Sequence, residues 1–360
     1  MKFIHIADMH FDSPFVNLAD KEYLGDLRRL DQRKIFKKVI EYIKENNIEF
    51  LFIAGDLYEH NYVKKTTIEY MNNLFKEIPK TKIFISPGNH DPFLKNSYYN
   101  KFLWNENVKI FNGKFEKYQT ETADIYGFGF DDFYCTNSDL ESVQIEDPNK
   151  LNVLIMHGTL DGASLEEKQY NSFKSKNLKE KDFEYVALGH IHKIDYNSYE
   201  NQRIVYPGST LSLGFDELGE HGMIVGELSK QHINLQFTPL DEKEFKIENI
   251  DVTQIEAKED LIEKLNEMNF EPNDLIEIYL IGKRNFEIDT YELYKLIENE
   301  KIIKIKNKTK INYNLEKIAE ENTLRGIFIK KMLEKLNNAE NTEEKEIIEK
   351  AIEVGLDSLQ

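Results

Sequence analysis

The stretch that decides the fold is Phe3-Ile4-His5-Ile6-Ala7-Asp8-Met9-His10, in which a mainly apolar run ends in a carboxylate and an imidazole. A short run of this kind, rich in aromatic and β-branched residues, predicts a buried strand with polar groups at its end. In an extended chain, side chains two positions apart point to the same side. Asp8 and His10 are therefore expected to meet a single metal ion.

Four further motifs follow in order, each at the end of a predicted strand. They are Gly55-Asp56, Gly88-Asn89-His90-Asp91, Met156-His157-Gly158 and Gly189-His190-Ile191-His192. With the first motif they supply carboxylate, amide and imidazole groups, enough to bind two divalent cations side by side. Paired cations are a common means of hydrolysing phosphate esters. Taken singly, most of these motifs also fit ordinary turns or core histidines, so the hypothesis depends on their combination.

The side chains of these motifs have different expected roles. Gly55 permits a tight turn, from which Asp56 could reach between two ions and bridge them. Asn89 offers a neutral carbonyl oxygen as a ligand. His190 and His192 lie on a turn, so their rings could serve different ions. The ligand mix favours Mn²⁺, with Fe²⁺ or Mg²⁺ as alternatives, over the thiolate sites of structural zinc.

The other two polar residues of the third motif are interpreted as catalytic. Adjacent side chains diverge, so His90 is expected to face the substrate and to stabilise or protonate the leaving oxygen. Asp91 would orient the His90 ring. The remaining histidines have no such context and are interpreted as ordinary: His5, His60, His221 and His232.

Composition limits the class of protein. The chain of 360 residues is 40% hydrophobic and 31% charged, with a formal net charge of −18. No apolar run approaches the ~20 residues of a membrane span. The single cysteine, Cys135, excludes an internal disulfide and suits the cytoplasm. The acidic charge argues against a protein that coats nucleic acid, so any DNA contact is expected in a patch near the cations.

The order of predicted elements favours an α/β protein. Up to residue 238, strands alternate first with helices and then with few helices, which indicates two packed sheets with the motifs on one rim. Residues 239–312 form a compact α/β module that ends in a lysine-rich strand. After Asn322 the pattern predicts two helices, with Thr342 as the cap of the second. Their apolar stripes consist of Leu324, Phe328, Met332 and Leu336, and of Ile348, Ile352 and Leu356.

At this point the chain resembles the calcineurin-like metallophosphoesterases and, more narrowly, the DNA-repair exonucleases of the SbcD type. The metal motifs carry this resemblance, and Tyr206-Pro207-Gly208-Ser209 also fits the family. Three further stretches are similar to the YhaO branch: His10-Phe11-Asp12-Ser13-Pro14-Phe15, Asn89-His90-Asp91-Pro92 and Ala351-Ile352-Glu353-Val354-Gly355-Leu356.

The resemblance implies a fold and a ligand set. The fold would be a two-sheet α/β sandwich metallophosphoesterase domain (1–238), a small α/β capping domain (239–312) and C-terminal helices that bind a partner (313–360). Asp56 would bridge the two ions, and His90 would be the catalytic imidazole. The first ion would also take Asp8, His10 and His192, and the second Asn89, His157 and His190.

The resemblance also implies an activity and partners. The activity would be Mn²⁺-dependent exonuclease and endonuclease cleavage of DNA, in which a metal-activated hydroxide attacks the phosphodiester. The partners would be an SMC-like ATPase of the SbcC type and a second copy of the chain. A phosphodiesterase or phosphatase for small phosphoesters, and a non-catalytic scaffold subunit, are the alternatives.

Three later features each have two interpretations. The lysines of the module, Lys301, Lys304, Lys306, Lys308 and Lys310, could contact DNA phosphates or protect a solvated strand edge. The apolar stripes of the last two helices could bind the ATPase or pack within the chain. An aromatic cluster at residues 98–104 could be core, a dimer face or a surface for stacked bases.

Overall fold

A computed structural model describes residues 1–18, 23–135, 140–161, 170–196 and 203–359. The chain divides into two compact units, one of Met1–Ile247 and Phe270–Glu277 and one of Glu248–Asn269 and Ile278–Gln360. Most of the expected capping domain and all of the expected helical segment lie in the second unit, and their separation into two domains stays a prediction. No helix in these ranges is both long and apolar enough to cross a membrane.

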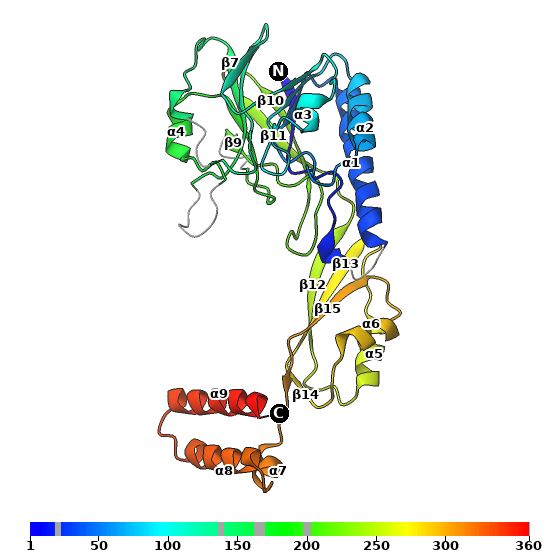
Figure 1. The fold of residues 1–360 in the computed structure, drawn as a ribbon, viewed down its shortest axis with the longest axis vertical. Helices are drawn as coiled ribbons and strands as arrows, with labels where there is room; N and C mark the ends of the chain where they lie inside the picture. Colours follow the sequence, from blue (N-terminus) through cyan, green and yellow to red (C-terminus); the bar gives the residue numbers. More distant parts are fainter. Residues whose placement is uncertain (19–22, 136–139, 162–169, 197–202, 360) are drawn as a thin grey trace. The chain divides into compact units, whose positions relative to one another are not determined.

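A six-stranded sheet of order β11-β10-β1-β2-β3-β4 contributes one half of the first unit (Figure 1). Strands β1 to β4 run parallel to one another, and β10 and β11 are added antiparallel. The strands are β1 (Lys2–Ile6), β2 (Phe50–Ile53), β3 (Lys82–Ile85), β4 (Val108–Ile110), β10 (Gly222–Leu228) and β11 (Ile233–Pro239).

A five-stranded sheet of order β5-β6-β7-β8-β9 forms the other half. Strands β6 to β9 are parallel, and β5 pairs antiparallel with β6. The prediction of a two-sheet α/β sandwich is therefore confirmed. The strands are β5 (Glu116–Gln119), β6 (Ala123–Phe128), β7 (Leu151–His157), β8 (Tyr185–Gly189) and β9 (Ile204–Val205).

Alternation along β1 explains how the layers are built. Ile4 and Ile6 belong to a core cluster with the apolar faces of α1 (Leu24–Asn46) and α2 (Lys65–Lys76), which cover one face of the six-stranded sheet. Phe3 points the other way, into a cluster shared with the five-stranded sheet. His5 also faces that sheet, where its Nδ1 lies 2.9 Å from the Tyr185 hydroxyl. His5 is thus a buried structural histidine, as the sequence predicts.

The outer face of the five-stranded sheet is covered by shorter elements. A third core cluster joins alternate residues of β7 and β8 to Leu178 of α4 (Ser175–Lys179) and to Leu140 of η2 (Leu140–Ser142). Two other short helices, η1 (Val16–Leu18) and α3 (Tyr98–Lys101), complete the first unit. In the aromatic cluster at residues 98–104, Tyr99 is buried in the core and Trp104 packs beside it, whereas Leu103 is 90% exposed.

The second unit contains short strands and the C-terminal helices. The division between the units falls within β12 (Glu244–Asp251) and β13 (Asp274–Ile281), which form a three-stranded sheet with β15 (Ile302–Asn307). The remaining elements are α5 (Lys258–Glu267), β14 (Lys283–Arg284), α6 (Thr290–Leu296), β16 (Lys310–Ile311), α7 (Leu315–Ala319), α8 (Leu324–Asn337) and α9 (Thr342–Ser358).

Apart from Leu324, which is 70% exposed, the apolar stripes of α8 and α9 pack against each other. Ile329, Ile348, Ile352 and Leu356 are buried in one cluster, against which Phe328, Met332 and Leu336 also pack. The stripes therefore fill the core of this helical pair, which leaves other apolar side chains exposed. The cap of α9 is also corrected, because Asn341, not Thr342, accepts the hydrogen bond from the Glu344 amide.

Several lysines of the lysine-rich segment have partners within the chain, among them Lys306, whose ammonium lies 3.5 Å from the Tyr279 hydroxyl. Lys310 forms an ion pair of 2.5 Å with Glu353 of α9. The Lys308 ammonium lies 3.4 Å from the centre of the Tyr279 ring, a cation–π contact. These contacts give the lysines partners within the chain, and protection of a solvated strand edge stays a prediction. Contact with DNA phosphates stays a prediction for the whole segment.

Arg28 provides a test of what holds the first unit together. Its side chain is fully buried and donates hydrogen bonds of 2.6 and 3.2 Å to the Asp241 carboxylate. Removing one partner of a buried ion pair costs about 3–5 kcal/mol, so Arg28→Met should lower the free energy of unfolding by that amount. Urea unfolding followed by fluorescence measures this unit directly, because the only tryptophan, Trp104, belongs to it.

The matched control for this prediction is Lys37→Met, on the same helix. Lys37 forms an exposed pair with Glu41 at 3.5 Å, and the loss of such a pair should cost less than about 1 kcal/mol. Equal effects of the two substitutions would contradict the role given to Arg28.

Candidate metal centre

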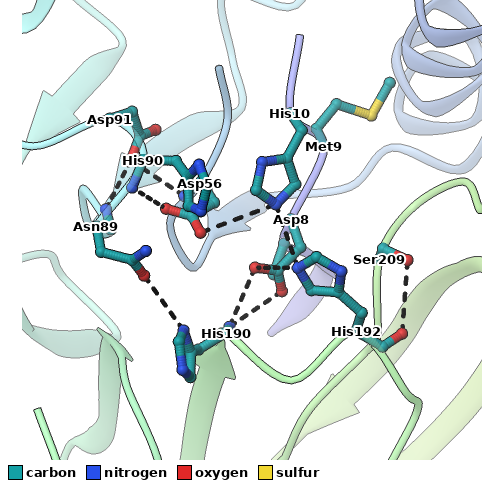
Figure 2. Close-up of polar contacts among 12 residues, drawn as sticks. Asp8, Met9, His10, Asp56, Asn89, His90, Asp91, His190, His192 and Ser209 are labelled. Atoms are coloured by element: carbon teal, nitrogen blue, oxygen red, sulfur yellow. Dashed lines mark hydrogen bonds and ion pairs between the residues drawn. The ribbon is translucent and has the colours of Figure 1, made fainter. Parts of the chain in front are cut away.

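The parallel strands bring the five motifs to one edge of the sandwich. β1, β2 and β3 end just before Asp8, Asp56 and Asn89, and β7 and β8 end at His157 and just before His190. Parallel neighbours place their carboxyl ends at the same edge of each sheet. Figure 2 shows side chains from both sheets pointing toward one another there.

The backbone at several of these residues is left-handed. Asp8, His10 and Asp56 have φ values of 51°, 47° and 50°, and His190 has φ of 103°. Such conformations are strained for residues other than glycine and tend to occur at functional sites. The prediction that an extended chain points Asp8 and His10 to the same side is thus wrong, because β1 ends at Ile6. Instead, backbone hydrogen bonds to the loop after β2 hold the two residues. The Asp8 amide donates to the Gly55 carbonyl, and the His10 amide donates to the Asp56 carbonyl.

One group of possible ligands consists of Asp8, His10 and His192. Their candidate ligand atoms all lie within 4.8 Å of one another. The Nε2 atoms of His10 and His192 are 3.2 Å apart, and the His192 Nε2 is 3.7 Å from an Asp8 oxygen. Two imidazole nitrogens and a carboxylate that converge in this way form a suitable set for one divalent cation.

A second group consists of Asp56, His157 and His190, again within 4.8 Å of one another. The His157 Nε2 is 3.3 Å from an Asp56 oxygen. The Asn89 side-chain oxygen lies 3.0 Å from that same nitrogen and 3.2 Å from the His190 Nδ1. Asn89 therefore lies beside this group, and His190 and His192 face different groups.

Asp56 connects the two groups. Besides its contact with His157, its carboxylate is 3.8 Å from the His10 Nε2, and it belongs to a third group with His10 and His90. Gly88 makes room for this carboxylate, and Gly55 makes room for the His157 ring. A Cβ on Gly88 would lie 2.3 Å from an Asp56 oxygen, and one on Gly55 would lie 2.4 Å from the His157 Nδ1.

Two carboxylates that the sequence analysis did not identify hold the imidazoles in place. Glu59 contacts the Nδ1 of His10 at 2.7 Å, and Glu217 contacts the Nδ1 of His192. Such contacts fix the ring so that its other nitrogen faces a metal. Glu59 could have been suspected, since it follows Asp56 by three residues on the same loop. Glu217 gave no local signal, because it reaches the site from a loop beyond β9.

His90 is arranged differently from the predicted ligands. Its side chain is 45% exposed, and its Nδ1 contacts Glu59 at 3.0 Å. Burial alone would lower the pKa of His90, but the hydrogen bond with Glu59 and the charge of Asp56 raise it to about 9. His90 thus presents a partly exposed ring beside the two ligand groups.

The predicted role of Asp91 is corrected by the structure. Its buried carboxylate accepts hydrogen bonds from the amides of Asp56, Leu57 and Gly88, and from the Tyr99 hydroxyl at 2.6 Å. Asp91 therefore fixes the backbone of the loops that carry Asp56 and Asn89. The carboxylate that contacts the His90 ring is that of Glu59.

The carboxylates of the centre favour positive charge on His157 and His192, whereas burial and the charge of His157 lower the pKa of His190 to about 3. Burial alone would lower the pKa of His157, yet Asp56 raises it to about 9. Burial would likewise lower the pKa of His192, but the hydrogen bond with Glu217 raises it to about 9. Burial would raise the pKa of Asp56, but His157 and His10 hold it well below its usual range.

The residues present fit a pair of divalent cations. Asp8 and Asp56 are at most 1% exposed, and in the described ranges their ion pairs are formed with imidazoles and with no lysine or arginine. Buried carboxylates need a compensating charge. Oxygen and imidazole ligands on both sides of Asp56 would provide two adjacent sites for it.

Comparison with known proteins agrees with this geometry. Residues 1–194 match the model of the calcineurin-like phosphoesterases. The chain belongs to this family. Its members use divalent metals, and the two ligand groups described above lie within the matched residues.

Three relatives are similar over much of the chain. An uncharacterized metallophosphoesterase, YhaO of Bacillus subtilis, is 24% identical over 71% of this chain and 64% of its own length. The match thus spans less than two thirds of that relative. The D subunit of the nuclease SbcCD from Staphylococcus epidermidis is 28% identical over 67% of this chain and 70% of that protein. Its counterpart in Staphylococcus saprophyticus is 29% identical over 67% of this chain and 69% of that protein.

Two solved structures also resemble part of the chain. TT1561 of Thermus thermophilus covers 66% of this chain and 98% of its own, with 11% identity and a TM-score of 0.38. Vacuolar protein sorting 29 of Cryptosporidium parvum covers 67% of this chain and 98% of its own, with 13% identity and a TM-score of 0.28.

Gly55 provides a test of the close packing around Asp56. Gly55→Ala should weaken Mn²⁺ binding by at least about tenfold, because the added methyl would displace His157. Isothermal titration with Mn²⁺ measures the effect. Gly219→Ala is the matched control, because Gly219 has a similar φ of 101° but open space around its Cβ in the described structure. Equal losses in the two variants would show that backbone strain, and not contact with His157, is responsible.

Proposed function

We propose that this protein is a two-metal phosphodiesterase that cleaves DNA. The observation that carries the proposal is the position of Asp56 between two ligand groups, with the His90 ring on the open side of both. Paired divalent cations polarise a phosphate and supply a nucleophile from water at neutral pH. We expect Mn²⁺ to be the metal, as the mixture of oxygen and imidazole ligands favours it.

The residues of the chain then have separate tasks. Asp8, His10 and His192 would hold one cation, Asn89, His157 and His190 would hold the other, and Asp56 would contribute to both sites. Glu59 fixes the rings of His10 and His90 at once, because each of its oxygens contacts one of them. The Glu59 contact positions His90 to donate a proton to the leaving oxygen.

DNA is the proposed substrate on two grounds. Two relatives that match about two thirds of the chain are subunits of a nuclease. In addition, the protein carries a second unit with its own sheet and helices, for which hydrolysis of a small phosphoester has no evident need. The proposed partner is an SMC-like ATPase of the SbcC type. A cytoplasmic location and a homodimer stay predictions from the sequence and the resemblance.

His90 provides the test of the catalytic role. His90→Ala should reduce Mn²⁺-dependent release of nucleotides from linear DNA by about 10²- to 10⁴-fold, the usual contribution of a general acid. Mn²⁺ binding should be retained, because His90 contacts Glu59 and is not one of the proposed ligands. Nucleotide release and titration with Mn²⁺ give the two measurements.

The control for this experiment is His232→Ala, a change of an exposed histidine outside the motifs. Rapid DNA cleavage by the His90→Ala protein would refute the catalytic role. Hydrolysis of small aryl phosphodiesters by the unaltered protein, with no cleavage of DNA, would favour the small-substrate alternative. Two bound Mn²⁺ ions with no hydrolysis of either substrate would favour a scaffold.

The partner proposal now rests on the outer faces of the last two helices. With their stripes packed against each other, α8 still exposes Leu324 and Ile327, and α9 exposes Ile347 and Val354, each by more than half. An amphipathic helix of a partner commonly binds to apolar side chains in such positions. We therefore expect the ATPase coiled coil to contact these faces.

Replacement of two of these side chains tests the partner proposal. Ile327→Glu combined with Ile347→Glu should abolish co-purification of the co-expressed ATPase, because the charges would be buried without partners. Tyr291→Glu, an exposed position on α6 of the same unit, is the control. An unchanged complex with the double variant would contradict the proposal.

A further inference from the structure

A cavity of about 460 Å³ opens beside the metal centre, next to Asn89 and His90. Its walls come from loops of both sheets, and its size is typical of a site for a small organic group. The lining residues are Glu59, Asn61, Asn89, His90, Phe133, Tyr134 and Tyr170.

Three aromatic rings form much of this wall. The rings of Tyr134 and Tyr170 are stacked, with centroids 5.9 Å apart and an angle of 21° between their planes. Tyr170 in turn lies 5.2 Å from the ring of His190, a proposed metal ligand. Phe133 contacts His60 edge-on at 5.6 Å. A series of aromatic faces therefore leads from the exposed Tyr134 to the centre.

The charges of the lining indicate which group the cavity accepts. None of its lining residues in the described part of the chain is a lysine or an arginine, and Glu59 adds a carboxylate. The His90 ring, whose pKa is raised, is already paired with Glu59 at 3.0 Å, so a phosphate would find no unpaired counter-ion on the described walls. A flat, neutral ring with polar edges fits better, because it can stack on the aromatic faces and meet the Asn61 amide.

We propose that this cavity binds the nucleobase of a nucleotide next to the phosphodiester that is cleaved. The inference rests on the proposed function and adds a base-binding subsite to it. A base is joined to its phosphate by a single sugar, so a phosphate at the metal centre places the base within reach of the cavity. Stacking tolerates every base, because each has a π-face. The subsite would thus recognise nucleotides without selecting a sequence.

Chromogenic esters of thymidine test this subsite. The two isomers carry 4-nitrophenyl phosphate on the 3′ or the 5′ oxygen, and both release 4-nitrophenol, so the base is joined to the retained phosphate through different positions of the sugar. Matched esters of abasic deoxyribose lack the base. Tyr134→Ala should lower kcat/KM about tenfold for at least one thymidine isomer, through a higher KM, and by less than about twofold for its abasic counterpart. Tyr134→Phe, which keeps the ring, should behave as the unaltered protein.

A second measurement separates the subsite from the catalytic proposal. Equilibrium dialysis with Mn²⁺ should show tighter binding of thymidine 5′-monophosphate than of deoxyribose 5-phosphate, and Tyr134→Ala should remove that difference. Equal effects of Tyr134→Ala on substrates with and without a base, or no effect on either, would overturn the subsite. Failure of the unaltered protein to hydrolyse any ester, with the binding difference intact, would instead contradict the proposed function alone.

Discussion

The shared, buried carboxylate of Asp56 is the constraint on which the rest of the site depends. Taking a carboxylate out of water costs several kcal/mol, which the surrounding groups must offset. The His90 amide donates to it at 2.8 Å, and His157 and His10 approach it from the two ligand groups. The left-handed turn at Asp56 is held in turn by Asp91, which accepts the amide hydrogen bonds of Asp56 and Leu57.

The same arrangement explains why both sheets are needed. One sheet delivers Asp8, Asp56 and Asn89, and the other delivers His157 and the turn that holds His190 and His192. Their cores pack through alternate side chains such as Phe3 and Tyr185, whose rings are 4.5 Å apart. The packing of the two sheets therefore sets how closely the ligands approach. A cavity with aromatic walls lies on the open side of the centre, beside His90.

Local pattern predicted much of the fold and the residues that converge, for a physical reason. Short apolar runs such as those within 50–54 and 82–86 favoured buried strands, and the turn residues soon after them were expected at a common edge. What depends on contacts between distant loops could not be predicted. Glu217 meets His192 across 25 residues, and Asp91 turned away from His90 because three backbone amides needed an acceptor. The aromatic wall likewise combines Tyr134 and Tyr170 from separate loops.

Anomalous diffraction from crystals grown with Mn²⁺ tests the central claim most directly. The account predicts two anomalous peaks about 3.5–4 Å apart, one on each side of the Asp56 carboxylate, with the His90 ring outside both coordination spheres. A single peak, or two peaks that do not share Asp56, would contradict it.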